Sequence, residues 1–225
     1  MTLSDLLADV RSRIDESAAS FWTDAELKRW MNQRYRQIAM AVRDAHEDFF
    51  QTTTTVNLVN GTQEYTLPTD HVAIRRVEVS FDGTNWYRAR PIRQGEIPLQ
   101  NQSTVLQGTT TDPRYYLAGL KIGIAPIPTA ASTNGLKIWY IQDVTDLSAD
   151  GDAPSLPTVL HPLISKFAAG DALKKDEEDA RGKALVEEAE TELRRLVAQI
   201  KPRIEDEPRY VNYIPESDLV EVSRS

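Results

Sequence analysis

The sequence predicts an α+β fold in which helices at both ends of the chain enclose a β-rich middle. Apolar residues recur at helical spacing before about residue 50 and after about residue 157. Between these regions, β-branched and aromatic runs alternate with turn dipeptides. Neither helical region can bury its apolar stripe alone, so we expect one discontinuous α-helical bundle with an inserted antiparallel β-sandwich or barrel-like domain and an extended C-terminal tail.

The expected division of the 225 residues follows these changes in pattern. Residues 1–50 form the first part of the helical domain and residues 51–148 form the β-rich inserted domain. Residues 149–201 form the second part of the helical domain, a helix hairpin, and residues 202–225 form the extended tail. A chain of this length can bury a substantial core.

The first region contains two predicted helices. Leu3 to Ile14 carries apolar residues at helical spacing, which indicates a short amphipathic helix. Thr23 and Glu26 then form a capping-box pattern, in which the hydroxyl and the carboxylate satisfy free amides of the first turn. The apolar side of the helix that follows continues to about Asp48.

The middle region has the features of short strands joined by tight turns. The dipeptides Asn60-Gly61, Asp82-Gly83 and Asn134-Gly135 can take the positive φ of hairpin turns. The polar segment 94–111 is expected to be a mobile loop. We expect strands near residues 54–59, 72–80, 85–90, 121–124 and 136–142.

Helical spacing returns after a proline-flanked linker at residues 149–157. One apolar stripe lies between Val159 and Phe167 and a second between Leu185 and Ile200. Asp176 is placed to cap the second helix, so the two helices are expected to form an antiparallel hairpin.

Composition excludes several classes of function. The chain has no cysteine, which excludes disulfides, a thiolate nucleophile and the usual thiolate zinc site. Its net charge of −8 disfavours a module that binds DNA by neutralising phosphates. No long apolar run and no signal-peptide pattern occurs, so we expect no membrane partner.

The sequence contains no recognisable catalytic, cofactor or metal site. His46, His71 and His161 are scattered, and none has a second ligand at a metal-binding interval. The acidic stretch from Asp143 to Asp152 lacks the spacing of a calcium loop and is better interpreted as a linker. No phosphate-binding loop or nucleophile elbow is present. We therefore expect a protein that is not an enzyme and has no cofactor.

Four short segments resemble one known family when taken together in chain order. Trp22-Thr23-Asp24-Ala25-Glu26-Leu27, followed by Trp30 and Asn32, is similar to the opening helices of bacteriophage head-to-tail adaptor proteins, also called connector or tail-tubular proteins. The further matches, which extend the resemblance to about residue 200, are Gly61-Thr62-Gln63-Glu64-Tyr65 with Leu67-Pro68 and Asp70, Ile124-Ala125-Pro126-Ile127-Pro128, and Leu156-Pro157 through His161 to Ala168-Ala169 and Leu173.

This resemblance implies a structural subunit of the virion. Such subunits form a ring, commonly a dodecamer, in the neck between the capsid and the tail. The expected partners are the portal protein, a tail nozzle or other tail protein, further copies of the chain, and double-stranded DNA that passes through a central channel without specific binding. The chain would be present in the host cytoplasm during assembly.

The tail is expected to bind the portal. Pro202, Pro208 and Pro215 stop helix propagation, yet the tail carries more apolar surface than a solvated segment usually has. A disordered or self-packed tail is the alternative. The predicted portal-binding residues are Arg203, Tyr210, Val211, Tyr213, Ile214, Leu219 and Val220.

Aromatic residues on the predicted strands leave a second function open. Trp86, Tyr87 and Trp139 could stack on sugars in a carbohydrate-binding or host-recognition module of the virion. Packing in a core or a subunit interface is the more common role of such residues.

Overall fold

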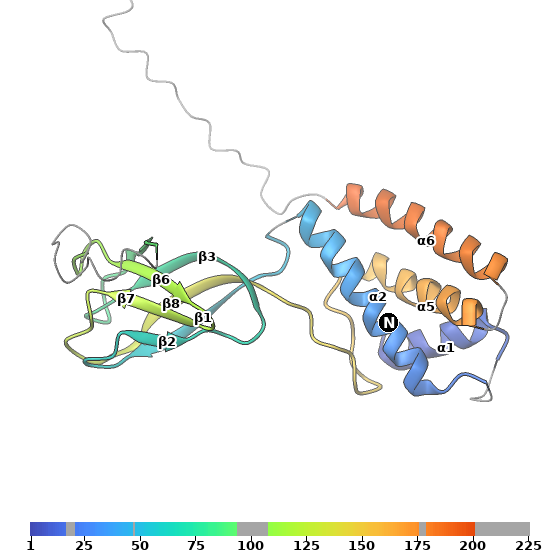
Figure 1. The fold of residues 1–225 in the computed structure, drawn as a ribbon, viewed down its shortest axis with the longest axis horizontal. Helices are drawn as coiled ribbons and strands as arrows, with labels where there is room; N and C mark the ends of the chain where they lie inside the picture. Colours follow the sequence, from blue (N-terminus) through green and yellow to red (C-terminus); the bar gives the residue numbers. More distant parts are fainter. Residues whose placement is uncertain (17–20, 47, 94–107, 176–178, 201–225) are drawn as a thin grey trace, which may run out of the picture.

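The computed structural model describes residues 1–16, 21–46, 48–93, 108–175 and 179–200. Helices and strands occupy opposite ends of the molecule (Figure 1). The helices are α1 (Leu3–Arg13), α2 (Asp24–Ala45), α5 (His161–Lys175) and α6 (Asp179–Gln199), with a 3₁₀ turn η2 (Thr158–Leu160) before α5. The strands are β1 (Gln51–Leu58), β2 (Glu64–Thr66), β3 (His71–Val79), β4 (Tyr87–Arg88), β5 (Arg90–Pro91), β6 (Arg114–Ala118), β7 (Lys121–Ala125) and β8 (Ser132–Gln142). This confirms the predicted α+β class.

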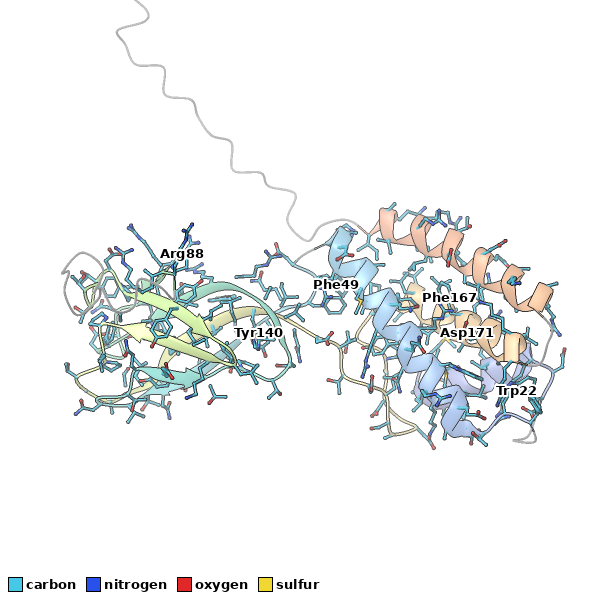
Figure 2. All side chains as sticks on the ribbon, viewed as in Figure 1. Trp22, Phe49, Arg88, Tyr140, Phe167 and Asp171 are labelled. Carbon is cyan, nitrogen blue, oxygen red and sulfur yellow. The ribbon has the colours of Figure 1, made fainter. Side chains whose placement is uncertain are left out.

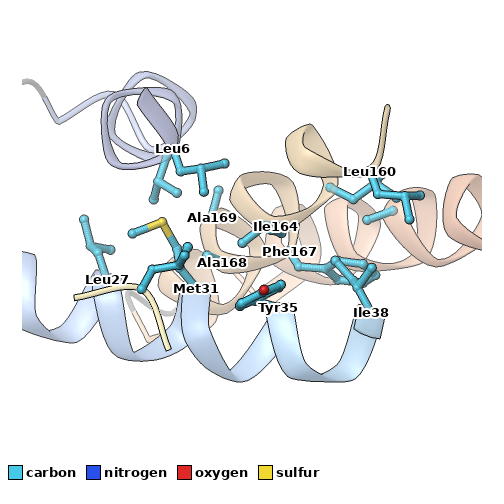
Figure 3. Close-up of a cluster of buried hydrophobic side chains, with 14 of the residues drawn as sticks. Leu6, Leu27, Met31, Tyr35, Ile38, Leu160, Ile164, Phe167, Ala168 and Ala169 are labelled. Carbon is cyan, nitrogen blue, oxygen red and sulfur yellow. The ribbon is translucent and has the colours of Figure 1, made fainter. Parts of the chain in front are cut away.

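The four helices form one layer from both ends of the chain, as the sequence predicts. Helices α1, α2 and α6 each contact α5, which lies between them. Figure 3 shows the apolar contact, where Met31 and Tyr35 of α2 face Ile164 and Phe167 of α5. Both N-terminal helices begin with a complete capping box, at Thr2 with Asp5 and at Thr23 with Glu26.

Helix α5 is buried on almost every side, whereas its sequence predicts only one apolar stripe. Polar residues such as Ser165 and Lys166 are buried along with the apolar ones. The reason is a second close contact on the side of α6, where Gly170 faces Gly182. A Cβ added to Gly182 would lie 2.7 Å from the carbonyl oxygen of Gly170, so only glycine permits this helix spacing.

The structure ends α2 at Ala45, three residues before the predicted end at Asp48. His46 adopts φ −141° and ψ 80°, which is not helical, while its backbone N–H still bonds to the carbonyl of Val42. Phe49 and Phe50 then pack edge to face and contact the helical core. The apolar period therefore continues past the helix because the chain beyond it packs on the same core.

The strands form two four-stranded sheets around a second core. The first sheet has the order β1-β8-β3-β4 and the second has the order β2-β7-β6-β5. Both sheets contribute to one buried cluster that includes Leu58, Val77, Ile122 and Ile138. The sheets do not close into a barrel. One pair, β5 with β6, is parallel and not antiparallel as predicted.

Three details of the strand prediction were wrong. The single strand expected at residues 85–90 is two short strands, β4 and β5, in different sheets, because the chain crosses between sheets at the buried Ala89. Strands β2 and β6 were not predicted. Strand β2 has only three residues, too few for a detectable alternation.

Asn134-Gly135 does not form a hairpin turn. It lies inside β8, where the register with β1 shifts between Val56 and Leu58. Asn134 has φ 53°, and a Cβ on Gly135 would lie 2.7 Å from the carbonyl oxygen of Ser80. The dipeptide is therefore a β-bulge, which uses the same positive φ as a turn.

Several predictions fall outside the described residues. They are the cap at Asp176, the loop at residues 94–107 and every predicted portal-binding residue of the tail. Residues 108–112, at the end of the expected loop, are described and contain a bridge between Thr109 and Asp112.

Candidate interaction surfaces

The three histidines serve the fold separately. The ring of His46 donates to the carbonyl of Val197 at 3.2 Å, and the ring of His71 lies 2.6 Å from the carbonyl of Pro68. His161 begins α5 and is buried, with its Nε2 3.0 Å from the carbonyl of Leu156. Within the part of the chain that the structure describes, no group of three or more metal-ligating side chains occurs.

The carboxylates of the acidic stretch from Asp143 to Asp152 make separate contacts and do not gather around one point. Asp146 pairs with Arg36 at 2.6 Å, and Asp150 pairs with Lys28 at 3.0 Å. Asp152 accepts backbone bonds from residues 148 and 149, which hold the pKa of its carboxyl below the usual range.

Two polar side chains of α2 bind the linker backbone. Asn32 donates to the carbonyl of Leu147 at 2.9 Å and accepts from its N–H at 2.8 Å. The hydroxyl of Tyr35 accepts from the N–H of Ser155 at 2.8 Å. Because both ends of the linker are held, the chain that leaves the β-sandwich has a fixed path across the helical layer.

An ion pair connects α2 directly to α5. Arg34 donates to both carboxylate oxygens of Asp171 at 2.6 Å, and its guanidinium lies 5.1 Å from the ring centroid of Phe167. Asp171 holds the pKa of Arg34 above its ordinary value, even though partial burial opposes this. Figure 2 labels Phe167 and Asp171 within the helical layer. Because α5 also contacts α1 and α6, this ion pair helps to join the four helices into one block.

Two shallow grooves lie on the outer faces of this block. The first, about 700 Å³, follows α2 and is lined by Lys28, Arg29, Gln33 and Met40 among others, with Met40 49% exposed. The second, about 610 Å³, follows α1. The two grooves lie on different helices and have different linings, so they could contact two different surfaces.

A third groove, of about 540 Å³, lies on the β-sandwich and is basic. Arg75, Arg76, Arg88 and Arg90 line it together with Asp112. Figure 2 shows Arg88 projecting from the sandwich. Arginine alternates with other residues in Tyr87-Arg88-Ala89-Arg90, which is a sequence signal for one side of this groove, whereas Arg75 and Arg76 are adjacent on β3.

Charge is distributed unevenly between the two ends of the molecule. Residues 51–142 contain eight Lys and Arg and six Asp and Glu, a net charge of +2, whereas the whole chain has −8. The remaining residues therefore carry −10. The surfaces of the two ends differ in charge as well as in secondary structure.

A scan against protein-family models gives the decisive comparison. The model of the SU10 adaptor protein matches residues 1–212, nearly the whole chain. The chain belongs to this adaptor family. The resemblance drawn from the sequence is thereby confirmed, and the protein is a bacteriophage adaptor, a structural component of the virion that binds other head or tail proteins.

No curated protein matches the adaptor significantly. Among the helices that the structure describes, none is long and apolar enough to cross a membrane.

Tyr87 and Trp139 of the adaptor do not share a face of the first sheet, as a common platform for sugars would require, and Trp86 is 43% exposed. Trp139 pairs with Arg76 on the outer face of the first sheet, whereas Tyr87 pairs with the fully buried Val79 on the inner face. Lys137 lies 4.8 Å and Arg76 5.8 Å from the ring of Trp139, so cations occupy the positions where a sugar would stack.

Proposed function

We propose that the adaptor assembles as a ring, a dodecamer, that joins the portal to the tail and surrounds the channel through which DNA passes. The observation that carries this proposal is the separation of two unlike ends (Figure 1). The helical end with its linker, residues 1–50 and 143–200, has a net charge of −8, whereas the β-sandwich, residues 51–142, has a net charge of +2. A subunit between two different assemblies needs two different ends. We assign the helical layer to the portal side and the sandwich to the tail or nozzle side.

The distribution of charge supports passage of DNA without specific binding. The negative charge lies outside residues 51–142: residues 143–160 carry −4, and residues 1–50, 161–200 and 201–225 carry −2 each. A channel wall formed by these acidic segments would repel phosphates and allow the duplex to slide. In this arrangement the basic groove of the sandwich faces away from the channel, toward a neighbouring protein.

The experiment that tests the ring is electron microscopy of the adaptor mixed with its cognate portal particles. We expect a ring of density, with as many adaptor copies as the portal symmetry accommodates. A monomer in free solution agrees with assembly on the portal. A ratio of one adaptor to one whole portal particle, or no binding at all, would contradict the proposal.

A cyclic ring requires that each subunit use two different faces for its neighbours. We place one of these contacts in the groove on α2, because Met40 is a large apolar side chain that is 49% exposed there. Met40→Glu should therefore prevent ring formation on the portal. Leu120→Glu is the matched control, since Leu120 is 63% exposed on the turn between β6 and β7, far from the helices.

We also propose that the tail binds the portal through the predicted residues Arg203, Tyr210, Val211, Tyr213, Ile214, Leu219 and Val220. Both cores consist of residues up to 200, so a chain truncated after residue 202 should keep its fold. Portal binding should weaken when residues 203–225 are deleted. Equal binding by the full and truncated chains would show that the tail has no part in docking.

A further inference from the structure

The β-sandwich leaves four strands at sheet edges, and three of them are protected. A sheet edge exposes unpaired backbone groups, which proteins usually shield by shortness, charge or proline. Strands β4 and β5 have two residues each and contain Arg88, Arg90 and Pro91. Strand β2 has three residues and contains Glu64, which pairs with Lys121 at 3.3 Å.

Strand β1 is the exception. It has eight residues, Gln-Thr-Thr-Thr-Thr-Val-Asn-Leu, without a charge, a proline or a glycine. Among the described strands it pairs only with β8. Four consecutive threonines give it a high preference for extended backbone. An edge of this length and composition is a template for another strand.

The register shows which backbone groups of β1 face outward. The backbone N–H of Gln142 donates to the carbonyl of Phe50. Phe50 lies opposite Gln142 in the same register that places Gln51 opposite Ile141. Hydrogen-bonded pairs alternate along an antiparallel ladder, so Thr52 and Thr54 bond to β8. Thr53 and Thr55 direct their N–H and C=O groups away from β8, toward the free edge.

We propose that in the free protein this edge is covered by residues 209–214 of the same chain, paired with β1 as a fifth strand of the first sheet. The segment reads Arg-Tyr-Val-Asn-Tyr-Ile and lies between Pro208 and Pro215. Four of its six residues are aromatic or β-branched, the types that favour strands. The flanking prolines limit the strand to six residues, which fits within the eight of β1.

The end of α6, after which the tail begins, lies near the beginning of β1. Val197, in the last turn of α6, accepts a hydrogen bond from His46, and His46 precedes β1 by five residues. An extended chain covers at most about 3.6 Å per residue, so these five residues span at most about 18 Å. Residues 201–208 can span up to about 29 Å, enough to bring residue 209 to the edge.

Either face of the added strand offers apolar side chains to the sandwich. Tyr210 and Ile214 lie on one side of an extended segment, and Val211 and Tyr213 lie on the other. Thr54 and Val56 of β1 point to the core side and are only partly buried. The added strand would therefore cover apolar surface at the same time as it pairs the backbone.

Amide hydrogen exchange of the full chain in solution tests this proposal. We expect the N–H groups of Thr53 and Thr55 to be protected from exchange, and deletion of residues 203–225 should increase their exchange rates at least about tenfold. Thr52 and Thr54 are internal controls, because their N–H groups bond to β8 in both proteins. Val211→Pro should have the effect of the deletion, whereas Leu219→Pro should not.

Three results would overturn the proposal. Fast exchange at Thr53 and Thr55 in the full chain would show an open edge. Protection that survives the deletion would show that something other than the tail covers the edge. Protection that grows with protein concentration would show pairing between two copies. The proposal concerns the free protein, so it can hold or fail independently of the ring and of portal binding.

Discussion

Individual polar side chains fix the position of one helix on another, where apolar packing alone would allow the helices to shift along each other. The bidentate bond between Arg34 and Asp171 has a defined geometry, and the side chains are only 18% and 19% exposed. Charge-assisted bonds of this type are stronger than neutral ones and are costly to break when one partner stays buried. The pair therefore sets the register of α2 on α5.

Asp171→Asn should lower the free energy of unfolding by about 2 kcal/mol, because it leaves the guanidinium of Arg34 partly buried without its carboxylate. The control is Asp146→Asn. Asp146 pairs with Arg36 at the same 2.6 Å distance, but both side chains are about half exposed. Exposed pairs contribute less than about 1 kcal/mol. Urea denaturation of both variants measures the difference, and equal losses would contradict a special role for the Arg34 pair.

Glu26 gives the helical layer a dependence on pH. An ion pair with Lys175, together with capping bonds to Thr23, lowers the pKa of its carboxyl to about 2. Because the folded pKa lies below the unfolded one, the stabilisation is complete above about pH 4.5 and is lost as the pH falls toward 2. Glu26→Gln should reduce the loss of stability over this interval, measured by denaturation at several pH values.

Glu187→Gln is the control for Glu26, since Glu187 is exposed on α6 and forms no ion pair in the described part of the chain. Its substitution should leave the pH profile unchanged. If Glu26→Gln and Glu187→Gln give the same profile, the carboxylate of Glu26 does not stabilise the helical layer through its ion pair.

At the scale of elements, two glycines determine how closely α5 and α6 approach. Gly182→Ala would place a Cβ 2.7 Å from a backbone oxygen that cannot move aside, so we expect a loss of about 1–3 kcal/mol despite the better helix propensity of alanine. Gly151→Ala, in the linker, meets no atom within 4 Å and should change stability little. Thermal unfolding of the two variants checks this, and similar melting temperatures would contradict the close approach.

The elements predicted well are those whose signal is local. The capping box at Thr23 and the period that follows it predict the start of α2, and a turn glycine such as Gly61 does take a positive φ. Contacts made by distant residues are not visible in this way. The crossing of the chain at Ala89 and the burial of α5 depend on which sheet or helix lies opposite.

The candidate surfaces were likewise not visible in local sequence patterns, because distant residues form them. The carboxylate of Asp171 is 137 residues from its partner Arg34, so no local pattern could pair them. The basic groove combines residues of β3, β4 and β5 that only the sheet order brings together. The protected and unprotected edges likewise depend on strand order. By contrast, the family was recognisable from short motifs, because their sequence order is retained.

At the scale of the whole molecule, two separate cores share one chain. The helical cluster and the β cluster have no buried residue in common, and within residues 1–200, as far as the structure describes them, the chain crosses between them near residues 46–51 and 142–147. The predicted boundaries of 1–50, 51–148, 149–201 and 202–225 remain a prediction about stability. If they are correct, each core should unfold as its own cooperative unit.

Ile138→Ala and Ile164→Ala are a matched pair for this test, because each removes the same atoms from a fully buried position in a different core. Each should cost about 2–5 kcal/mol in its own core. Ile138→Ala should lower the denaturation midpoint of amide signals from the strands and leave those of the helices unchanged, and Ile164→Ala should do the reverse. If either substitution shifts both sets of signals equally, the chain unfolds as one unit and the boundaries are wrong. Separate midpoints would instead mean that an adaptor subunit can adjust one end to its neighbour while the other end keeps its fold.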